Sequence, residues 1–137
     1  MAPIRMGFIG CGGNARGHIG RVLEMGECEV VSLCDSSEGS LQAACEHYGE
    51  NVEHLPHFVD YKEMLDSVEM DAVQISTPHT LHFEQIMASL DKGLHVLSEK
   101  PMVCTVDHAH QVIAKAEESG KVLMVSYQRH LGAQYRY

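Results

Sequence analysis

The sequence has 137 residues, the usual size of one domain, and 45% of them are apolar, which is enough for a sizeable core. Its formal net charge of −9 and pI near 5.5 disfavour nucleic acid as a partner, because a basic face is the usual footprint of such binding. No apolar run approaches the roughly 18 residues of a membrane span, and the first residues lack the features of a signal peptide. Five cysteines without a C-x-x-C pair favour reduced thiols in a cytoplasmic protein over a disulfide framework or a zinc site.

Short apolar segments recur along the chain, and several are continuous rather than alternating. Such segments are typical of strands that are covered on both faces of a sheet. The predicted strands are residues 5–10, 29–34, 71–76, 94–98 and 122–126, with a weaker candidate at 57–59.

Helical periodicity separates these segments. Apolar residues recur with i, i+3, i+4, i+7 spacing over residues 41–48, 83–90 and 109–116, so each helix would present one apolar stripe to a sheet. The alternation of strands and helices predicts one α/β domain over residues 1–137, a doubly wound parallel sheet (Rossmann fold) with strand order 3-2-1-4-5-6. In such sheets ligands bind beyond the carboxyl ends of the strands, at the point where the strand order reverses.

Capping residues support the predicted helix ends. Asp60 is expected to cap a short helix, and Thr77 followed by Pro78 is expected to begin the helix over 83–90. Glycines stand where a left-handed C-cap is expected, at Gly26, Gly49, Gly93 and Gly120.

The segment GCGGNA, between the first predicted strand and the first helix, matches G-x-G-x-x-A. Gly10 would make the tight turn, Gly12 would leave room for a pyrophosphate, and Ala15 would let the helix pack closely against the strand. Gly13 and Asn14 lie at the helix N-terminus, where bare N–H groups face phosphates. The alternative is a glycine-rich turn that binds no ligand.

Asp35 follows the second predicted strand, 25 residues after Gly10. A carboxylate there can accept hydrogen bonds from the ribose hydroxyls of an adenosine and would repel a 2′-phosphate. No Arg or Lys lies within residues 36–40, so NAD is favoured over NADP. The alternative is a solvated acid at the strand end or at a helix N-terminus.

Residues 76–101, STPHTLHFEQIMASLDKGLHVLSEKP, contain two motifs at the ends of predicted strands. The first is T-P-x-x-x-H, and the second is E-K-P. Together with GFIGCGGNARGHI, they resemble the glucose–fructose oxidoreductase / inositol dehydrogenase / rhizopine catabolism (Gfo/Idh/MocA) family over essentially the whole chain.

The resemblance implies a cofactor site assembled from these motifs. Thr77 and Pro78 would line the adenosine and pyrophosphate side, and Ser76 beside them belongs to the same expected site. His82 would lie near the nicotinamide ribose, and Glu99 would approach the nicotinamide end.

Lys100 is the candidate catalytic residue. The resemblance implies that it lies where cofactor and substrate meet and takes part in substrate binding and proton transfer. An alcohol that is oxidised by hydride loss also loses a proton, and a lysine is a suitable acceptor. The alternative for Glu99 and Lys100 is an exposed, solvated charge pair.

The histidines show no spacing that is typical of a metal site, so no metal is expected. Five of them are expected at the surface or at an interface: His18, His47, His54, His57 and His95.

Members of this family are longer, and the second domain that carries most of their substrate pocket is absent from this chain. The sequence is therefore interpreted as an excised domain, a truncated product or a solitary module. The resemblance implies an NAD(P)-dependent oxidoreductase acting on CH–OH groups of a sugar, inositol or related polyol. We expect the fragment to bind nucleotide with little or no turnover and to self-associate as a homo-oligomer through surface left uncovered. A non-catalytic NAD(P)-sensing or regulatory module is the alternative.

Overall fold

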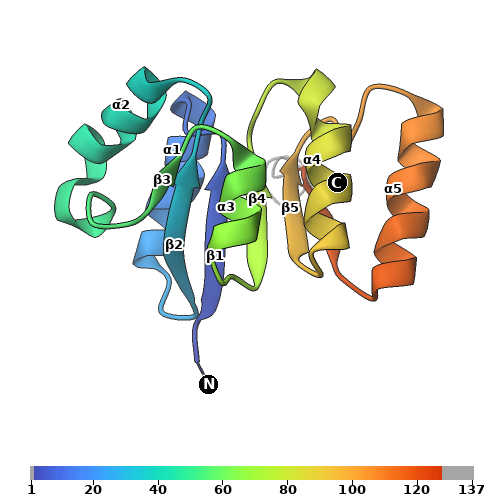
Figure 1. Ribbon diagram of the computed structural model, residues 1–137, viewed down its shortest axis with the longest axis horizontal. Coiled ribbons are helices and arrows are strands. Elements are labelled where there is room, and N and C mark those ends of the chain that lie inside the picture. Colours follow the sequence, from blue (N-terminus) through green and yellow to red (C-terminus); the bar gives the residue numbers. More distant parts are fainter. Residues whose placement is uncertain (1, 128–137) are drawn as a thin grey trace, which may run out of the picture.

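The computed structural model describes residues 2–127, so the end of the predicted domain lies outside the described residues. Its six strands form one parallel sheet with the order β3-β2-β1-β4-β5-β6, which confirms the predicted topology (Figure 1). The strands are β1 (Ile4–Ile9), β2 (Cys28–Cys34), β3 (His57–Phe58), β4 (Ala72–Ile75), β5 (His95–Glu99) and β6 (Leu123–Ser126). The weak candidate at 57–59 is thus a real edge strand, although it is only two residues long.

Each crossover between strands carries a helix. The helices are α1 (Gly13–Glu24), α2 (Glu38–Tyr48), α3 (Tyr61–Ser67), α4 (His82–Asp91) and α5 (Val106–Ser119), with short 3₁₀ turns at Gly49–Asn51 and His79–Leu81. Within residues 2–127, none of the helices is long and apolar enough to cross a membrane.

The sheet separates two apolar cores. Phe8 and Ile9 are neighbours in β1 and point to opposite faces of the sheet, and both are buried. Phe8 packs in the core with residues of α1 and α2, such as Ile19, whereas Ile9 packs in the core with residues of α3, α4 and α5, such as Ile86. This two-sided burial explains why the strands appear in the sequence as continuous apolar runs.

The caps follow the predictions only in part. Gly120 ends α5 in the left-handed conformation, with φ 64° and ψ 20°. The predicted cap at Gly26 is wrong, because α1 ends at an extended Met25 and Gly26 does not have a positive φ. The predicted start of a helix at Thr77 is also wrong: a 3₁₀ turn intervenes, and α4 begins at His82.

Asp60 caps α3 as predicted, because its side chain accepts a hydrogen bond from the Lys62 N–H.

Two glycines within α1 differ in how much space a side chain would have at their positions. A Cβ on Gly20 would lie 2.9 Å from the Tyr48 hydroxyl oxygen, so a side chain there would require the Tyr48 side chain at the end of α2 to shift. Gly17 is exposed, and a Cβ on it would meet nothing within 4 Å. Packing between helix and strand therefore does not explain Gly17, and an alanine there would favour the helix.

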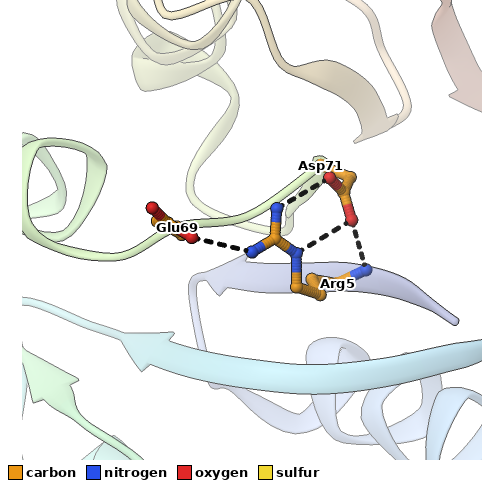
Figure 2. Close-up of polar contacts among 3 residues, drawn as sticks. All are labelled: Arg5, Glu69 and Asp71. Carbon is orange, nitrogen blue, oxygen red and sulfur yellow. Dashed lines mark hydrogen bonds and ion pairs between the residues drawn. The ribbon is translucent and has the colours of Figure 1, made fainter. Parts of the chain in front are cut away.

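Arg5 joins the start of β1 to the segment that precedes β4 (Figure 2). Its guanidinium donates to both carboxylate oxygens of Asp71, from Nη2 over 3.0 Å and from Nε over 3.1 Å, and its backbone N–H donates over 2.9 Å. Nη1 also contacts Glu69 at 3.2 Å. The hydrogen bonds from the Arg5 side chain and backbone lower the pKa of the Asp71 carboxyl from 3.8 to about 2.

Asp71→Asn is expected to flatten the acid dependence of stability. A lowered pKa stabilises the fold only while the carboxyl is ionised, so this contribution is present above about pH 4 and is lost as the pH falls toward 2. Chemical denaturation between these pH values should therefore give a shallower loss of unfolding free energy in the variant. Glu69→Gln is the matched control, because the Glu69 side chain is 93% exposed. Equal slopes for wild type and Asp71→Asn would contradict this assignment.

Candidate functional site

Two cavities lie at the carboxyl ends of the central strands, where the strand order reverses. The first, of about 410 Å³, lies between the ends of β2 and β4. It is lined by Ile9, Gly10, Gly12, Cys34, Asp35, Ser36, Val59, Tyr61, Ser76, Thr77, Pro78, Leu81 and Gln85. The second, of about 330 Å³, lies toward β5 and is lined by Asn14, Ser76, Thr77, His79, Glu99 and Lys100. Because both cavities share Ser76 and Thr77, they form two halves of one site.

Gly10 lies at the centre of this site and has a conformation that only glycine adopts easily. Its φ is +93°, and a Cβ would lie 2.8 Å from the backbone carbon and oxygen of Ser76. Its N–H donates to the Cys34 carbonyl over 2.7 Å, which ties the turn to the end of β2. The predicted tight turn is therefore present.

Gly12 is the N-cap of α1 and differs from Gly10. Its backbone is extended, with φ −65° and ψ −178°, and a Cβ there would meet nothing within 4 Å. The fold itself therefore does not require glycine at this position. Gly13 and Asn14 follow as the first residues of α1, whose N-terminal N–H groups have no partners within the helix.

Ala15 and Cys11 face inward from the turn. Ala15 is 1% exposed, in agreement with close packing of α1 on the sheet. Cys11 is fully buried, and this burial, aided by the charge of Asp35, raises the pKa of its thiol to about 12. The helix N-terminus therefore does not activate Cys11, which is a small packing residue.

Asp35 is half-buried at the end of β2, and its carboxylate bridges two backbone segments. One oxygen accepts from the Cys11 N–H over 2.8 Å, and the other accepts from the Ser37 N–H over 2.9 Å. Both oxygens retain a further lone pair, so the carboxylate can also accept from hydroxyl groups in the first cavity.

The segment after β4 forms the wall shared by the two cavities. The Ser76 hydroxyl accepts a hydrogen bond from the Gln74 side chain, and the Thr77 hydroxyl donates to Oε1 of Gln85 over 2.5 Å. Pro78 is exposed beside them.

His82 lies behind this wall rather than on it. It is fully buried, with Nε2 3.0 Å from the Thr77 carbonyl and Nδ1 2.8 Å from the Pro101 carbonyl. The resemblance implies a place near the nicotinamide ribose, and in this structure neither ring nitrogen is open to a ligand. His82 instead links the segment after β4 to the segment after β5.

Glu99 ends β5 and is only 5% exposed. Its Oε1 accepts from Nε2 of His18 over 2.8 Å, and its carboxylate also accepts from the Asn14 side chain and from the Lys100 N–H. His18, which was expected at the surface or at an interface, is only 12% exposed and lies against Glu99.

Lys100 is exposed and lines the second cavity beside Glu99. The Lys100–Pro101 peptide bond is cis. The alternative of an exposed, solvated Glu99–Lys100 charge pair does not describe this structure, because the Glu99 carboxylate is buried. Only the Lys100 side chain is accessible from the cavity. Among the described residues, no cluster of His, Cys, Asp and Glu could hold a metal ion.

The sequence profile of the Gfo/Idh/MocA family, described as an oxidoreductase family with an NAD-binding Rossmann fold, matches residues 4–127. The chain belongs to this family. It is similar to a D-glucoside 3-dehydrogenase of Escherichia coli K12, with 32% identity over 92% of this chain and 35% of that protein. An α-N-acetylgalactosaminidase of Shewanella oneidensis is 28% identical over 91% of this chain and 28% of that protein.

Solved structures of similar proteins agree with this assignment. The WlbA dehydrogenase of Bordetella pertussis, in complex with NADH and UDP-GlcNAcA, has a TM-score of 0.88 and 31% identity, and the match covers 97% of this chain and 39% of that one. A scyllo-inositol dehydrogenase of Lactobacillus casei with bound NAD(H), at 23% identity, has the same fold with a TM-score of 0.88. The chain thus corresponds to the NAD-binding Rossmann domain of the Gfo/Idh/MocA family, and it spans between 28% and 39% of the length of these relatives.

Several lining residues of this Gfo/Idh/MocA domain were not expected from the sequence. Val59 and Tyr61 follow the short strand β3, and Gln85 lies in α4, after the wall that follows β4. Applying the strand-end rule to the edge strand would have identified the first two, but β3 is too short to give a clear signal.

Gly10→Ala is expected to destabilise the fold more than Gly12→Ala, which loses only part of the N-cap preference of glycine over alanine. The first change forces a positive φ on alanine and places its Cβ 2.8 Å from the Ser76 backbone, at a cost on the order of 1–3 kcal/mol or more. The second change meets no atom within 4 Å and keeps an ordinary backbone. Denaturant unfolding of both variants checks this difference, and equal loss of stability would contradict it.

Proposed function

We propose that this chain holds NAD for an oxidoreductase that moves a hydride between the nicotinamide and a CH–OH carbon of a sugar, inositol or related polyol. In this proposal His82 supports the cofactor site from behind its wall. The other residues of the site are Gly10, Gly12, Gly13, Asn14, Ala15, Asp35, Ser76, Thr77, Pro78, Glu99 and Lys100.

The observation that carries the proposal is the glycine at position 12. Ser, Asn or Asp would cap α1 at least as well as glycine, and Gly12 meets no protein atom that would exclude their side chains. Gly12 lines the first cavity at the N-terminus of α1, where N–H groups and the helix dipole favour an anion. A pyrophosphate that approaches the backbone accounts for the missing side chain.

The two cavities then take the two halves of the dinucleotide. In the first, Asp35 accepts from the ribose hydroxyls, and the exposed apolar side chains of Val59 and Leu81 offer surface for the adenine. In the second, Asn14, Glu99 and Lys100 surround the nicotinamide end. Because α1 begins directly after the turn, its first residues place Asn14 at the second cavity and Ala15 against the sheet.

Bound NAD supplies the carbon that accepts the hydride. Lys100 is the chain's own catalytic candidate, because its side chain is exposed at the second cavity and its Nζ can take the proton that the alcohol releases. Thr77, Pro101 and the buried His82 between them hold the two walls of this cavity together.

The substrate class is supported by the relatives. One is a glucoside dehydrogenase, and a structural neighbour was solved with a UDP-linked sugar acid. Because this chain spans little more than a third of those proteins, we propose that it binds NAD alone but shows little or no turnover alone.

Gly12→Ala is expected to lower NAD affinity at least tenfold while the protein stays folded. The added methyl group occupies space in which the pyrophosphate would lie, and even a modest clash costs more than the 1.4 kcal/mol that corresponds to tenfold. Isothermal titration with NAD measures this loss. Gly17→Ala is the matched control, because it adds the same methyl group to an exposed position of α1 outside both cavities. Unchanged affinity in Gly12→Ala, or no NAD binding by the wild type at millimolar concentration, would refute the proposal.

Asp35→Ala is expected to weaken NAD more than NADP. The change removes the acceptor for the ribose hydroxyls, and each lost hydrogen bond to a charged group costs roughly 1.5–3 kcal/mol. It also removes the repulsion of a 2′-phosphate, so the preference for NAD should fall by about tenfold or more. Titrations with both cofactors give the ratio, and a melting curve verifies that loss of the bonds to Cys11 and Ser37 leaves the fold intact. An unchanged ratio would show that Asp35 does not face the ribose.

A further inference from the structure

A buried carboxylate at the nicotinamide end of the site is not explained by holding the cofactor alone. Glu99 is 5% exposed, yet it lines the second cavity together with Asn14 and Lys100. Burying a charged group is costly unless hydrogen bonds compensate it. An amide or a hydroxyl at this position could form similar contacts with a smaller free-energy cost of burial. Structural contacts alone therefore do not explain why this residue carries a charge.

The surroundings of Glu99 keep it ionised. Burial favours the neutral acid, but hydrogen bonds from His18, Asn14 and the Lys100 N–H outweigh this effect, and the pKa of Glu99 is lowered. His18 and Asn14 are four residues apart on one face of α1, so the helix that presents its N-terminus to the first cavity also holds this carboxylate.

We propose, on the basis of the NAD-binding function above, that Glu99 makes the site discriminate between the two redox forms of the cofactor in favour of NAD⁺. The nicotinamide ring carries a positive charge in NAD⁺ and none in NADH. A fixed negative charge beside the ring stabilises only the charged form, and its effect is strong because the carboxylate is shielded from water. Glu99 is therefore a specificity-determining residue for the oxidised cofactor.

Among the residues that the structure describes, three other ionisable side chains lie around the site, and each leaves the Glu99 carboxylate able to act on the ring. The Lys100 side chain is exposed, so solvent and salt screen its charge far more than that of Glu99. His79 lines the same cavity from an exposed position. His18 contacts Glu99 directly, and a neutral imidazole can hold the carboxylate with Nε2–H without neutralising it.

Titration of the 137-residue chain with NAD⁺ and with NADH, separately, tests the proposal. Glu99→Gln keeps an acceptor for His18 and removes the charge. It is expected to shift the ratio of the two dissociation constants by about tenfold toward NADH, chiefly through weaker NAD⁺ binding. Glu99→Asp keeps the charge and should retain most of the wild-type ratio. Glu46→Gln, on the exposed side of α2, removes an equal charge far from the cavities and should leave the ratio unchanged.

His18→Lys supplies a second route that leaves Glu99 in place. A permanent cation beside the carboxylate compensates its charge, so the ratio should shift toward NADH as it does in Glu99→Gln. An equal loss of affinity for both forms in the Glu99 and His18 variants would overturn the proposal and reduce Glu99 to a structural tie between α1 and β5. A wild type that binds neither form would instead refute NAD binding itself, so the two failures can be told apart.

Discussion

The close approach of the turn after β1 to the end of β4 is the constraint on which the site depends. Gly10 donates to the carbonyl of Cys34 in β2, while the N–H of Ser76 donates to the carbonyl of Ile9 in β1. Three strand ends are thus held together at the point where the sheet changes direction. A Cβ at position 10 would clash with the Ser76 backbone, so only glycine fits there. This close approach directs the N-terminus of α1 toward the two cavities.

Two carboxylates flank this centre, and the chain satisfies both before any ligand binds. Asp35 accepts from backbone N–H groups of the turn and of the segment before α2, whereas Glu99 accepts from α1 and from its own strand end. Both are therefore fixed in position as well as charged. A preorganised charge needs no rearrangement when a ligand arrives, so it can discriminate between ligands that differ in charge and not in shape.

The fold could be predicted because its signals are local and repeated. Continuous apolar strands alternate with amphipathic helices, and each crossover repeats the same physical solution. Contacts that join distant segments left no such signal. His18 was expected at the surface or at an interface, since nothing in GFIGCGGNARGHI indicates that it meets Glu99, 81 residues later. His82 was expected near a ribose, and its burial between the carbonyls of Thr77 and Pro101 could not be foreseen because it depends on the path of two loops.

The glycines of GFIGCGGNARGHI look alike in the sequence, but the structure shows that they are glycine for different reasons. Gly10 is required by the fold, through its positive φ and the Ser76 backbone, whereas Gly12 has neither constraint. Gly17 also lacks both, but it lies outside the cavities, so an open position alone does not indicate a ligand. Only Gly12 combines a freely substitutable backbone with a place at a helix N-terminus and in a cavity wall. That combination, rather than the number of glycines, distinguishes a phosphate-binding turn from a merely tight one.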